Sequence, residues 1–327
     1  MPKVLITPTT LVVTEGPWVK YLRDAGFEVV FPKRLVQPTE EELLQELAGV
    51  TATLAGSEPY TRSVLDAHPQ LRVIARAGVG FDAVDLAAAL DHGVAVTIAP
   101  GTNQEAVAEH TFALILALSR DIVPQDKAVR TGKWPRRPHL PLRGWTLGIA
   151  GLGRIGKAVA VRGAAFGMKL LAHEPYPDKQ FVEQYKVKLV PFEQLLKESD
   201  YLTVHVPLAA ESHHLINKKT LALMKPSAFL INTARGGLVC EADLIEALRN
   251  KKLGGAGLDV FEEEPTSANN PLFQFDNVVL TPHAAGTDLT SRDDMAMAAA
   301  GAIIQLSRGE WPAEQIVNPE VKSKFRW

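Results

Sequence analysis

The sequence has a single cysteine, Cys240, among 327 residues. One thiol cannot form an internal disulfide bond, and it cannot supply the several thiolates of a cysteine-rich metal site. The longest clearly apolar run covers residues 112–118, far fewer than the ~20 residues that cross a bilayer. The N-terminus carries Lys3 and is only briefly apolar, which indicates a first strand and not a signal peptide. These absences predict a cytoplasmic protein with no membrane partner.

The chain also lacks an excess of charge of either sign. It has 35 Lys and Arg residues against 37 Asp and Glu residues, which gives a net charge of −2. Since nucleic-acid-binding proteins usually carry a basic surplus, we expect no nucleic-acid partner. The hydrophobic content of 46% is sufficient for buried cores. At about 150 residues per domain, the length suggests two domains.

Short apolar runs alternate with helix-like segments along the whole chain. This alternation is typical of parallel sheets with helices on both faces, so we expect an α/β fold. Strands are expected at residues 4–6, 29–31, 53–55, 73–75, 95–98, 146–150, 169–173, 201–204, 229–232, 256–259 and 278–280. Helices are expected at residues 18–24, 39–47, 103–119, 155–166 and 291–308.

Regular structure breaks at residues 131–141, where three prolines stand among basic residues. The segment could be a surface linker. We prefer to interpret it as an extended arm that contacts a second subunit.

A glycine-rich turn directly follows the expected strand at residues 146–150 and precedes an expected helix. It reads GLGRIG, with Gly151, Gly153 and Gly156 at the three glycine positions of a dinucleotide-binding fingerprint. The first glycine permits the tight turn, the second lets the backbone approach a pyrophosphate, and the third lets the helix lie close to the sheet. The positive N-terminal end of the helix then faces the phosphate charge, which Arg154 could also neutralise.

An acidic residue stands where such a fold binds the cofactor ribose. Glu174 ends the next expected strand, 18 residues after Gly156 and close to the ~20 residues that this fold requires. A carboxylate there accepts hydrogen bonds from the ribose hydroxyls and repels a 2′-phosphate. The sequence therefore predicts NAD as the cofactor in preference to NADP.

Three ionisable residues each follow an expected strand in the second half of the chain. They are Arg235, Glu264 and His283. Because the carboxyl ends of parallel strands form the ligand crevice of an open α/β sheet, the three side chains can converge there. An imidazole suits proton transfer at neutral pH, a carboxylate orients it, and a guanidinium binds a substrate carboxylate with two parallel hydrogen bonds.

The motifs together resemble the D-isomer-specific 2-hydroxyacid dehydrogenase family over nearly the whole chain. Besides the glycine turn, they are RAGVGFDAVD at 76–85, AEHT at 108–111, NTARG at 232–236, GLDVFEEEP at 257–265 and TPH at 281–283. The resemblance implies a catalytic set of Arg235, Glu264 and His283. It implies a substrate-binding set of Arg76, Val79, Gly80, Asn103 and Arg235. It implies that NAD is held by Gly151, Gly153, Arg154, Ile155, Gly156, Glu174, His205, Val206, Pro207, Thr233, Ala234, Asp259, His283 and Gly286.

Within these sets the resemblance implies particular contacts. The backbone N–H groups of Val79 and Gly80 receive the substrate carboxylate, Asp259 binds the nicotinamide amide, and residues 205–207 line the adenine.

The same resemblance implies two doubly wound parallel-sheet, Rossmann-like domains. A substrate-binding domain at residues 1–99 and 288–327 is completed by the C-terminal helix, and an NAD-binding domain covers residues 100–287. A cleft between them is expected to close on substrate, with hinges near residues 99–103 and 284–287. A homodimer built on the cofactor domain is also implied.

Other histidines and the cysteine receive structural interpretations. His213 and His214 are adjacent in sequence with no visible partner cluster, so no metal site is expected. His110 is interpreted as a packing or hinge residue, and Cys240 as inert.

The sequence says least about the substrate. Arg76 favours a phosphorylated acid, so 3-phosphoglycerate is placed first, ahead of hydroxypyruvate or glyoxylate, with D-lactate-type acids behind. The loop at 55–58 lacks the extra arginine of some phosphoglycerate dehydrogenases, and Arg62, Arg136 or Arg137 would have to substitute. Formate is disfavoured because it offers no hydroxyl proton. An NAD-sensing, corepressor-like binding protein is the alternative of another class.

Overall fold

A computed structural model describes residues 1–12 and 15–327 and divides them into two compact units. The first unit joins Met1–Asn103 to Thr287–Trp327, and the second unit is Gln104–Gly286. Each unit contains one parallel sheet, so the predicted α/β class with two parallel-sheet domains is confirmed. Among the described residues, no helix is both long and apolar enough to span a bilayer.

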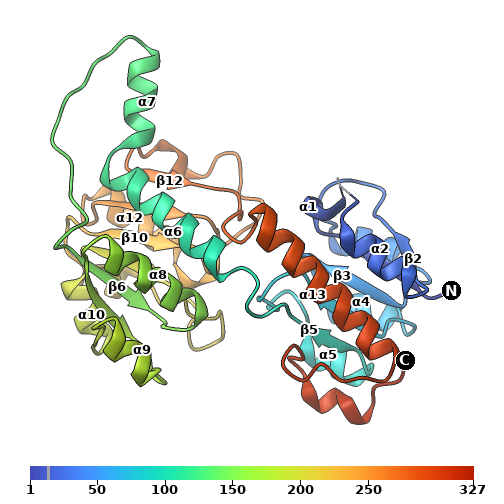
Figure 1. The fold of residues 1–327 in the computed structure, drawn as a ribbon. Helices are drawn as coiled ribbons and strands as arrows, with labels where there is room; N and C mark the ends of the chain where they lie inside the picture. The colour runs from blue at the N-terminus through green and yellow to red at the C-terminus, as the bar shows by residue number, and fades with distance from the viewer. Residues whose placement is uncertain (13–14) are drawn as a thin grey trace. The chain divides into compact units, whose positions relative to one another are not determined.

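The first sheet has the strand order β2-β1-β3-β4-β5 (Figure 1). Its strands are β1 (Lys3–Ile6), β2 (Glu28–Val30), β3 (Ala52–Ala55), β4 (Val73–Arg76) and β5 (Ala95–Thr97). Successive side chains of a strand point to opposite faces, so Val4 and Ile6 enter one hydrophobic core while Leu5 enters the other.

The helices of the first unit cover both faces of that sheet. They are α1 (Thr9–Val12), α2 (Pro17–Asp24), α3 (Glu40–Glu46), α4 (Arg62–Ala67), α5 (Leu86–Asp91) and α13 (Leu289–Ser307). The helix α13 comes from the far end of the sequence, yet its Ala296, Ala300 and Ile303 share a core with Val4 and Ile6 of the first strand. The first sheet therefore depends on the last helix for one of its covering layers.

The second sheet has the order β12-β11-β10-β9-β6-β7-β8. Its strands are β6 (Thr146–Ala150), β7 (Lys169–His173), β8 (Lys188–Leu189), β9 (Tyr201–Val204), β10 (Phe229–Asn232), β11 (Gly255–Leu258) and β12 (Val278–Leu280). The chain proceeds outward from β6 to β8 on one side and then from β9 to β12 on the other. The strand order thus reverses at β6 and β9, the position where doubly wound sheets bind ligands.

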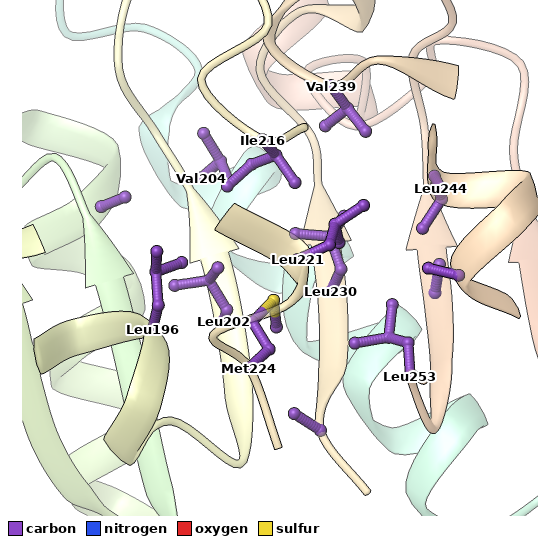
Figure 2. Close-up of a cluster of buried hydrophobic side chains, with 14 of the residues drawn as sticks. Leu196, Leu202, Val204, Ile216, Leu221, Met224, Leu230, Val239, Leu244 and Leu253 are labelled. Carbon is purple, nitrogen blue, oxygen red and sulfur yellow. The ribbon is translucent and has the colours of Figure 1, made fainter. Parts of the chain in front are cut away.

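Two hydrophobic cores, one on each face, hold the second sheet to its helices. The helices of this unit are α6 (Gln104–Ser119), α7 (Ile122–Arg130), α8 (Arg154–Ala165), α9 (Lys179–Gln184), α10 (Phe192–Glu198), α11 (Lys218–Leu221) and α12 (Glu241–Arg249). Of these, α7 contributes no residue to either core. Figure 2 shows one core, in which Leu202 and Leu230 from the strands meet Leu196, Leu221 and Leu244 from the helices. On the other face, Phe112 and Ile115 of α6 lie in a core with Ile149 of β6.

The segment after α6 differs from the sequence-based expectation. A further helix, α7, begins after Asp121, whose φ of 49° turns the chain sharply between the two helices. None of the α7 residues is buried, and Figure 1 shows α7 and the following loop extending away from the sheet of their own unit.

Candidate active site

The glycine turn lies at the carboxyl end of β6, where the strand order of the second sheet reverses. Gly151 has a φ of +92°, and a Cβ at this position would lie 2.7 Å from the His205 carbonyl oxygen. A Cβ on Gly156 would lie 2.1 Å from the Gly151 carbonyl oxygen. Both positions therefore require glycine, the first for the turn and the last for the approach of α8 to the strand.

The middle glycine meets open space. A Cβ on Gly153 would have no heavy atom within 4 Å, and Gly153 caps α8 without offering a side-chain acceptor. The first N–H groups of α8 need an acceptor from elsewhere, and an anion at a helix N-terminus meets that need. Arg154 and Ile155 form the first turn of the helix, and Arg154 is exposed. The turn has the room and the polarity that a pyrophosphate group requires.

The carboxylate of Glu174 points back to the glycine turn. Its Oε2 accepts a hydrogen bond from Leu152 N at 2.9 Å, and its Oε1 accepts one from Tyr176 N at 2.9 Å. A carboxylate has about four lone-pair sites, so two further hydrogen bonds from ribose hydroxyls can be accommodated. The structure thus brings the expected ribose acid to the expected turn.

The segment 205–207 follows β9, the neighbour of β6. His205 N donates to Ala150 O at 2.7 Å, and its ring Nε2 lies 2.8 Å from Thr203 Oγ1. Burial lowers the pKa of His205 to about 3, so its ring is neutral at physiological pH. Val206 is half-buried and Pro207 is exposed. A neutral, largely apolar segment beside the glycine turn suits the adenine part of a dinucleotide.

An imidazole–carboxylate pair lies at the other side of the sheet's carboxyl edge. His283 Nδ1 lies 2.6 Å from Glu264 Oε2, and the two side chains are 35% and 32% exposed. Burial by itself raises the pKa of Glu264. The hydrogen bond and charge of His283, the Phe261 N–H and the Arg235 guanidinium together hold that pKa below its ordinary value. Glu264 is therefore a carboxylate at neutral pH and leaves Nε2 as the reactive end of the ring.

The third member of the predicted set lies on the adjacent strand end. Arg235 follows β10, Glu264 follows β11 and His283 follows β12, and these strands are neighbours in the sheet. Asn232 Nδ2 donates to Arg235 O at 2.8 Å, and a Cβ on Gly236 would lie 1.8 Å from Phe261 O. The loop of Arg235 is therefore packed directly on the loop of Glu264. The structure brings Arg235, Glu264 and His283 together, as predicted from strand ends alone.

A buried carboxylate, Asp259, holds the loop of His283, although the sequence analysis assigned it to the nicotinamide amide. Asp259 is fully buried, and its carboxylate accepts hydrogen bonds from Thr281 Oγ1 at 2.6 Å, Ala284 N at 2.9 Å and Ala285 N at 2.8 Å. His283 N also donates to Asp259 O at 2.7 Å and its φ is 52°, a left-handed conformation that such bonds must maintain. Asp259 is a positioning residue in this geometry, and its contact with the nicotinamide amide stays a prediction.

Two residues that were missed or underestimated complete this support. Thr281 Oγ1 lies 2.9 Å from His110 Nε2, which in turn lies 3.5 Å from Asp259 Oδ1. The interpretation of His110 as a packing or hinge residue did not include these contacts. A polar residue two positions before His283 was the available signal for Thr281.

The remaining predicted residues divide between the units. In the second unit, Thr233 is buried with its Oγ1 3.0 Å from Thr111 Oγ1, and Ala234 and Gly286 are half-buried. In the first unit, Val79 and Gly80 are half-buried on the loop after β4, and Asn103 is 8% exposed.

Arg76 of the first unit has a position that its sequence motif did not predict. Its side chain is 5% exposed, and Nε donates a hydrogen bond to Gly80 O at 2.9 Å. The guanidinium supports the Gly78–Val79–Gly80 loop from within.

Comparison with known proteins agrees with this geometry. Residues 112–285 match the model of the D-isomer specific 2-hydroxyacid dehydrogenase NAD binding domain. A glyoxylate reductase from Thermofilum pendens is 41% identical over 329 residues, covering 98% of this chain and 95% of that protein.

A D-3-phosphoglycerate dehydrogenase from Archaeoglobus fulgidus is 41% identical over 303 residues. The aligned part covers 92% of this chain but only 57% of the length of that relative.

A solved structure is similar over almost its whole length. The D-lactate dehydrogenase of Aquifex aeolicus, crystallised with NAD and lactic acid, superimposes with a TM-score of 0.86 at 29% identity, covering 96% of this chain and 99% of that one. These similarities agree with the dinucleotide turn and the Arg–Glu–His cluster described above. The chain belongs to the D-isomer-specific 2-hydroxyacid dehydrogenase family and is an NAD-dependent oxidoreductase acting on a CH–OH group.

Proposed function

We propose that this enzyme reduces a small, unphosphorylated 2-oxo acid, with glyoxylate and hydroxypyruvate as the first candidates. The burial of Arg76 carries the choice. A guanidinium that is 5% exposed and donates to Gly80 O supports the loop and does not present a solvent-facing charge to a phosphate. Arg76 is the residue on which the sequence-based preference for 3-phosphoglycerate depends. In our proposal its burial removes the support for that preference.

A second buried residue of the first unit points the same way. Glu58, on the loop after β3, is fully buried and accepts hydrogen bonds from Gly56 N at 2.9 Å and Tyr60 Oη at 3.0 Å. The side chain of Glu58 is used inside this loop, so position 58 offers a substrate phosphate no cation. The Thermofilum relative named glyoxylate reductase, which aligns over nearly its full length, is consistent with this choice.

The residues of the chain divide the work of the reaction. NADH held by the glycine turn and Glu174 would supply the hydride that reduces C2 of the 2-oxo acid. In our proposal His283 Nε2 donates a proton to the oxygen that becomes the hydroxyl, and Glu264 stabilises the charged imidazole from Nδ1. Arg235 binds the carboxylate and polarises the reacting carbonyl with its planar guanidinium. The assignment of the backbone N–H groups of Val79 and Gly80 to a substrate carboxylate stays a prediction.

A panel of acids tests the substrate. NADH consumption is followed with glyoxylate, hydroxypyruvate, hydroxypyruvate phosphate, pyruvate and 2-oxoglutarate. We expect kcat/KM for glyoxylate or hydroxypyruvate to exceed that for hydroxypyruvate phosphate by about 10-fold or more, because the buried guanidinium of Arg76 does not offset the desolvation of the phosphate. A preference for the phosphate ester would reject the proposal in favour of 3-phosphoglycerate, the candidate that the Archaeoglobus relative supports.

The cofactor preference has its own test at Glu174. Replacement Glu174→Ala removes the carboxylate that repels a 2′-phosphate, so we expect the ratio of kcat/KM for NADH over NADPH to fall by about 10-fold or more. Steady-state rates with both cofactors measure it. Glu183→Ala, an exposed acid on α9, is the matched control. An unchanged NADH-to-NADPH ratio in Glu174→Ala would show that another residue distinguishes the ribose 2′-hydroxyl from a 2′-phosphate.

We also propose that the chain forms a homodimer through α7 and the loop at 131–141. Ile122 and Val129 on α7 are 53% and 49% exposed, and Trp134 on the loop is 76% exposed. Apolar side chains gathered on one extended segment are typical of a protein interface. We expect the double variant Ile122→Glu/Val129→Glu to sediment at half the mass of the wild-type protein. Leu35→Glu, at an equally exposed leucine of the first unit, should keep the wild-type mass, and a monomeric wild-type protein would contradict the proposal.

A further inference from the structure

Three side chains of the second unit that have no role in the proposed reaction lie close together. One nitrogen of His214, the sulfur of Cys240 and one carboxylate oxygen of Glu262 all lie within 4.8 Å of one another. The His214 imidazole and the Glu262 carboxylate are in hydrogen-bond contact through Nε2 and Oε1. The sequence shows no partner for His214, because Cys240 and Glu262 come from distant segments. The structure supplies both.

Backbone pairing fixes two of these residues relative to each other. His214 N donates to Gly237 O at 2.8 Å, Ile216 N donates to Leu238 O at 2.9 Å, and Cys240 N donates to Ile216 O at 2.8 Å. This short parallel ladder runs from His214 to Cys240, the residue that caps α12. The spacing of the imidazole and the thiol is therefore a property of the folded backbone.

Reciprocal hydrogen bonds fix the third residue. Glu262 N donates to Glu241 Oε1 at 2.6 Å, and Glu241 N donates to Glu262 Oε2 at 3.2 Å. Glu241 is also held by Asn270, whose Nδ2 donates to Oε2 at 3.1 Å. The carboxylate of Glu262 is thus oriented by the first residue of α12, with Oε1 directed at His214. Outer partners that orient a ligand in this way are a regular feature of metal sites.

The three ligand types determine which cation the cluster suits. Imidazole nitrogen, thiolate sulfur and carboxylate oxygen are the ligands of zinc, whereas Ca²⁺ and Mg²⁺ require oxygen ligands. Around a tetrahedral zinc ion the ligand atoms are roughly 3.5 Å apart. The Cys240 sulfur, up to 4.8 Å from the other two atoms, therefore has to approach them, while the hydrogen-bonded His214 nitrogen and Glu262 oxygen have to separate, both by side-chain rotation. Burial raises the pKa of the Cys240 thiol, and the charges of Asp243 and Glu262 raise it further, so a cation has to displace the thiol proton.

We propose that His214, Cys240 and Glu262 form a binding site for one zinc-class divalent cation, with solvent completing the coordination. On binding, the Cys240 thiol loses its proton to solvent, and the His214 imidazole passes the Nε2 proton that faces Glu262 through solvent to Nδ1. Nε2, the thiolate and the Glu262 oxygen then bind the cation, and no electron is transferred. The cation ties together the segments at 214, 240 and 262. It therefore stabilises the loop that also carries Glu264, and it takes no part in hydride transfer.

The test uses the full-length protein without an affinity tag, since a histidine tag would itself bind the probe. Co²⁺ is titrated in place of zinc, because thiolate ligation of Co²⁺ gives an intense near-ultraviolet charge-transfer band. We expect the band to saturate at one Co²⁺ per chain and to disappear on addition of Zn²⁺. In Cys240→Ser the band should be lost, and zinc affinity by calorimetry should fall by at least about 10-fold, the smallest loss that removal even of an outer partner usually causes.

Neighbouring residues of the same types provide matched controls. His213→Gln alters the histidine stacked on His214, and Glu263→Gln alters the exposed acid next to Glu262. Both should keep the band and the affinity, whereas His214→Gln and Glu262→Gln should weaken binding. A thermal scan of each variant with and without Zn²⁺ gives a second readout, in which the midpoint rises only when the three ligands are present. A Co²⁺ spectrum without the thiolate band, or a zinc affinity equal in wild type and Cys240→Ser, would overturn the proposal.

Discussion

The variant His283→Ala is expected to lose ~10²–10⁴ of turnover while it still binds NADH, because only the proton transfer is removed. The 2.6 Å contact between His283 Nδ1 and Glu264 Oε2 leaves Nε2 as the single ring atom available to the substrate. In our proposal, cofactor binding depends mainly on the glycine turn and Glu174, which lie on other strand ends. The measurement is steady-state kcat together with NADH fluorescence titration.

A second imidazole–carboxylate pair in the same chain provides the control. His92 Nε2 lies 2.6 Å from Asp66 Oδ1 in the first unit, a contact of the same length outside the candidate site. The variant His92→Ala should therefore lose only the small stability that this surface contact contributes. Its turnover should match that of the wild type. If His283→Ala kept near-normal turnover, another group would have to be the acid, and our mechanism would be wrong.

The variant Arg235→Lys is expected to lower kcat/KM by about 10²–10³, the loss that follows removal of one donor aimed at a developing oxyanion. A lysine keeps the positive charge but replaces a planar fork with a single point, so it cannot hold a carboxylate and a carbonyl oxygen together. Because Arg235 acts electrostatically on Glu264, the retained charge should preserve the ionisation of the Glu264–His283 pair. The loss should therefore come from substrate binding and polarisation.

The comparison of kcat with KM separates these contributions. If Arg235 binds substrate and transition state equally, KM rises and kcat is unchanged; if it acts only in the transition state, kcat falls. We expect both to change, and Arg249→Lys on α12 serves as the control for an arginine replaced elsewhere in the same unit. An unchanged kcat/KM in Arg235→Lys would exclude the bidentate role.

The sequence predicts most of the catalytic cluster because parallel strands align their carboxyl ends. Arg235, Glu264 and His283 are up to 48 residues apart, yet each follows a strand, and neighbouring strands must place their following residues at one edge. The glycine turn was predictable for a similar reason, since its spacing reflects the close approaches that a Cβ would block. Local rules sufficed where the fold itself determines the neighbours.

Elsewhere the sequence contained no comparable rule. The burial of Arg76 depends on how one loop folds over its own side chain, and no residue pattern records that. The convergence of His214, Cys240 and Glu262 depends on backbone pairing between irregular segments. The helix α7 was missed because Pro124 stands in its first turn, where proline is tolerated, and because its apolar residues face no core of their own chain.

The position of α13 in the first unit has a consequence for biosynthesis. As the polypeptide leaves the ribosome, residues 104–286 are complete before Leu289–Ser307 has been made. The second unit can therefore fold as an autonomous body while the five-stranded sheet still exposes the apolar face that Ala296, Ala300 and Ile303 will cover. The part of the chain that is translated first is thus expected to mature last, and its exposed face is the one that a chaperone would protect in the interval.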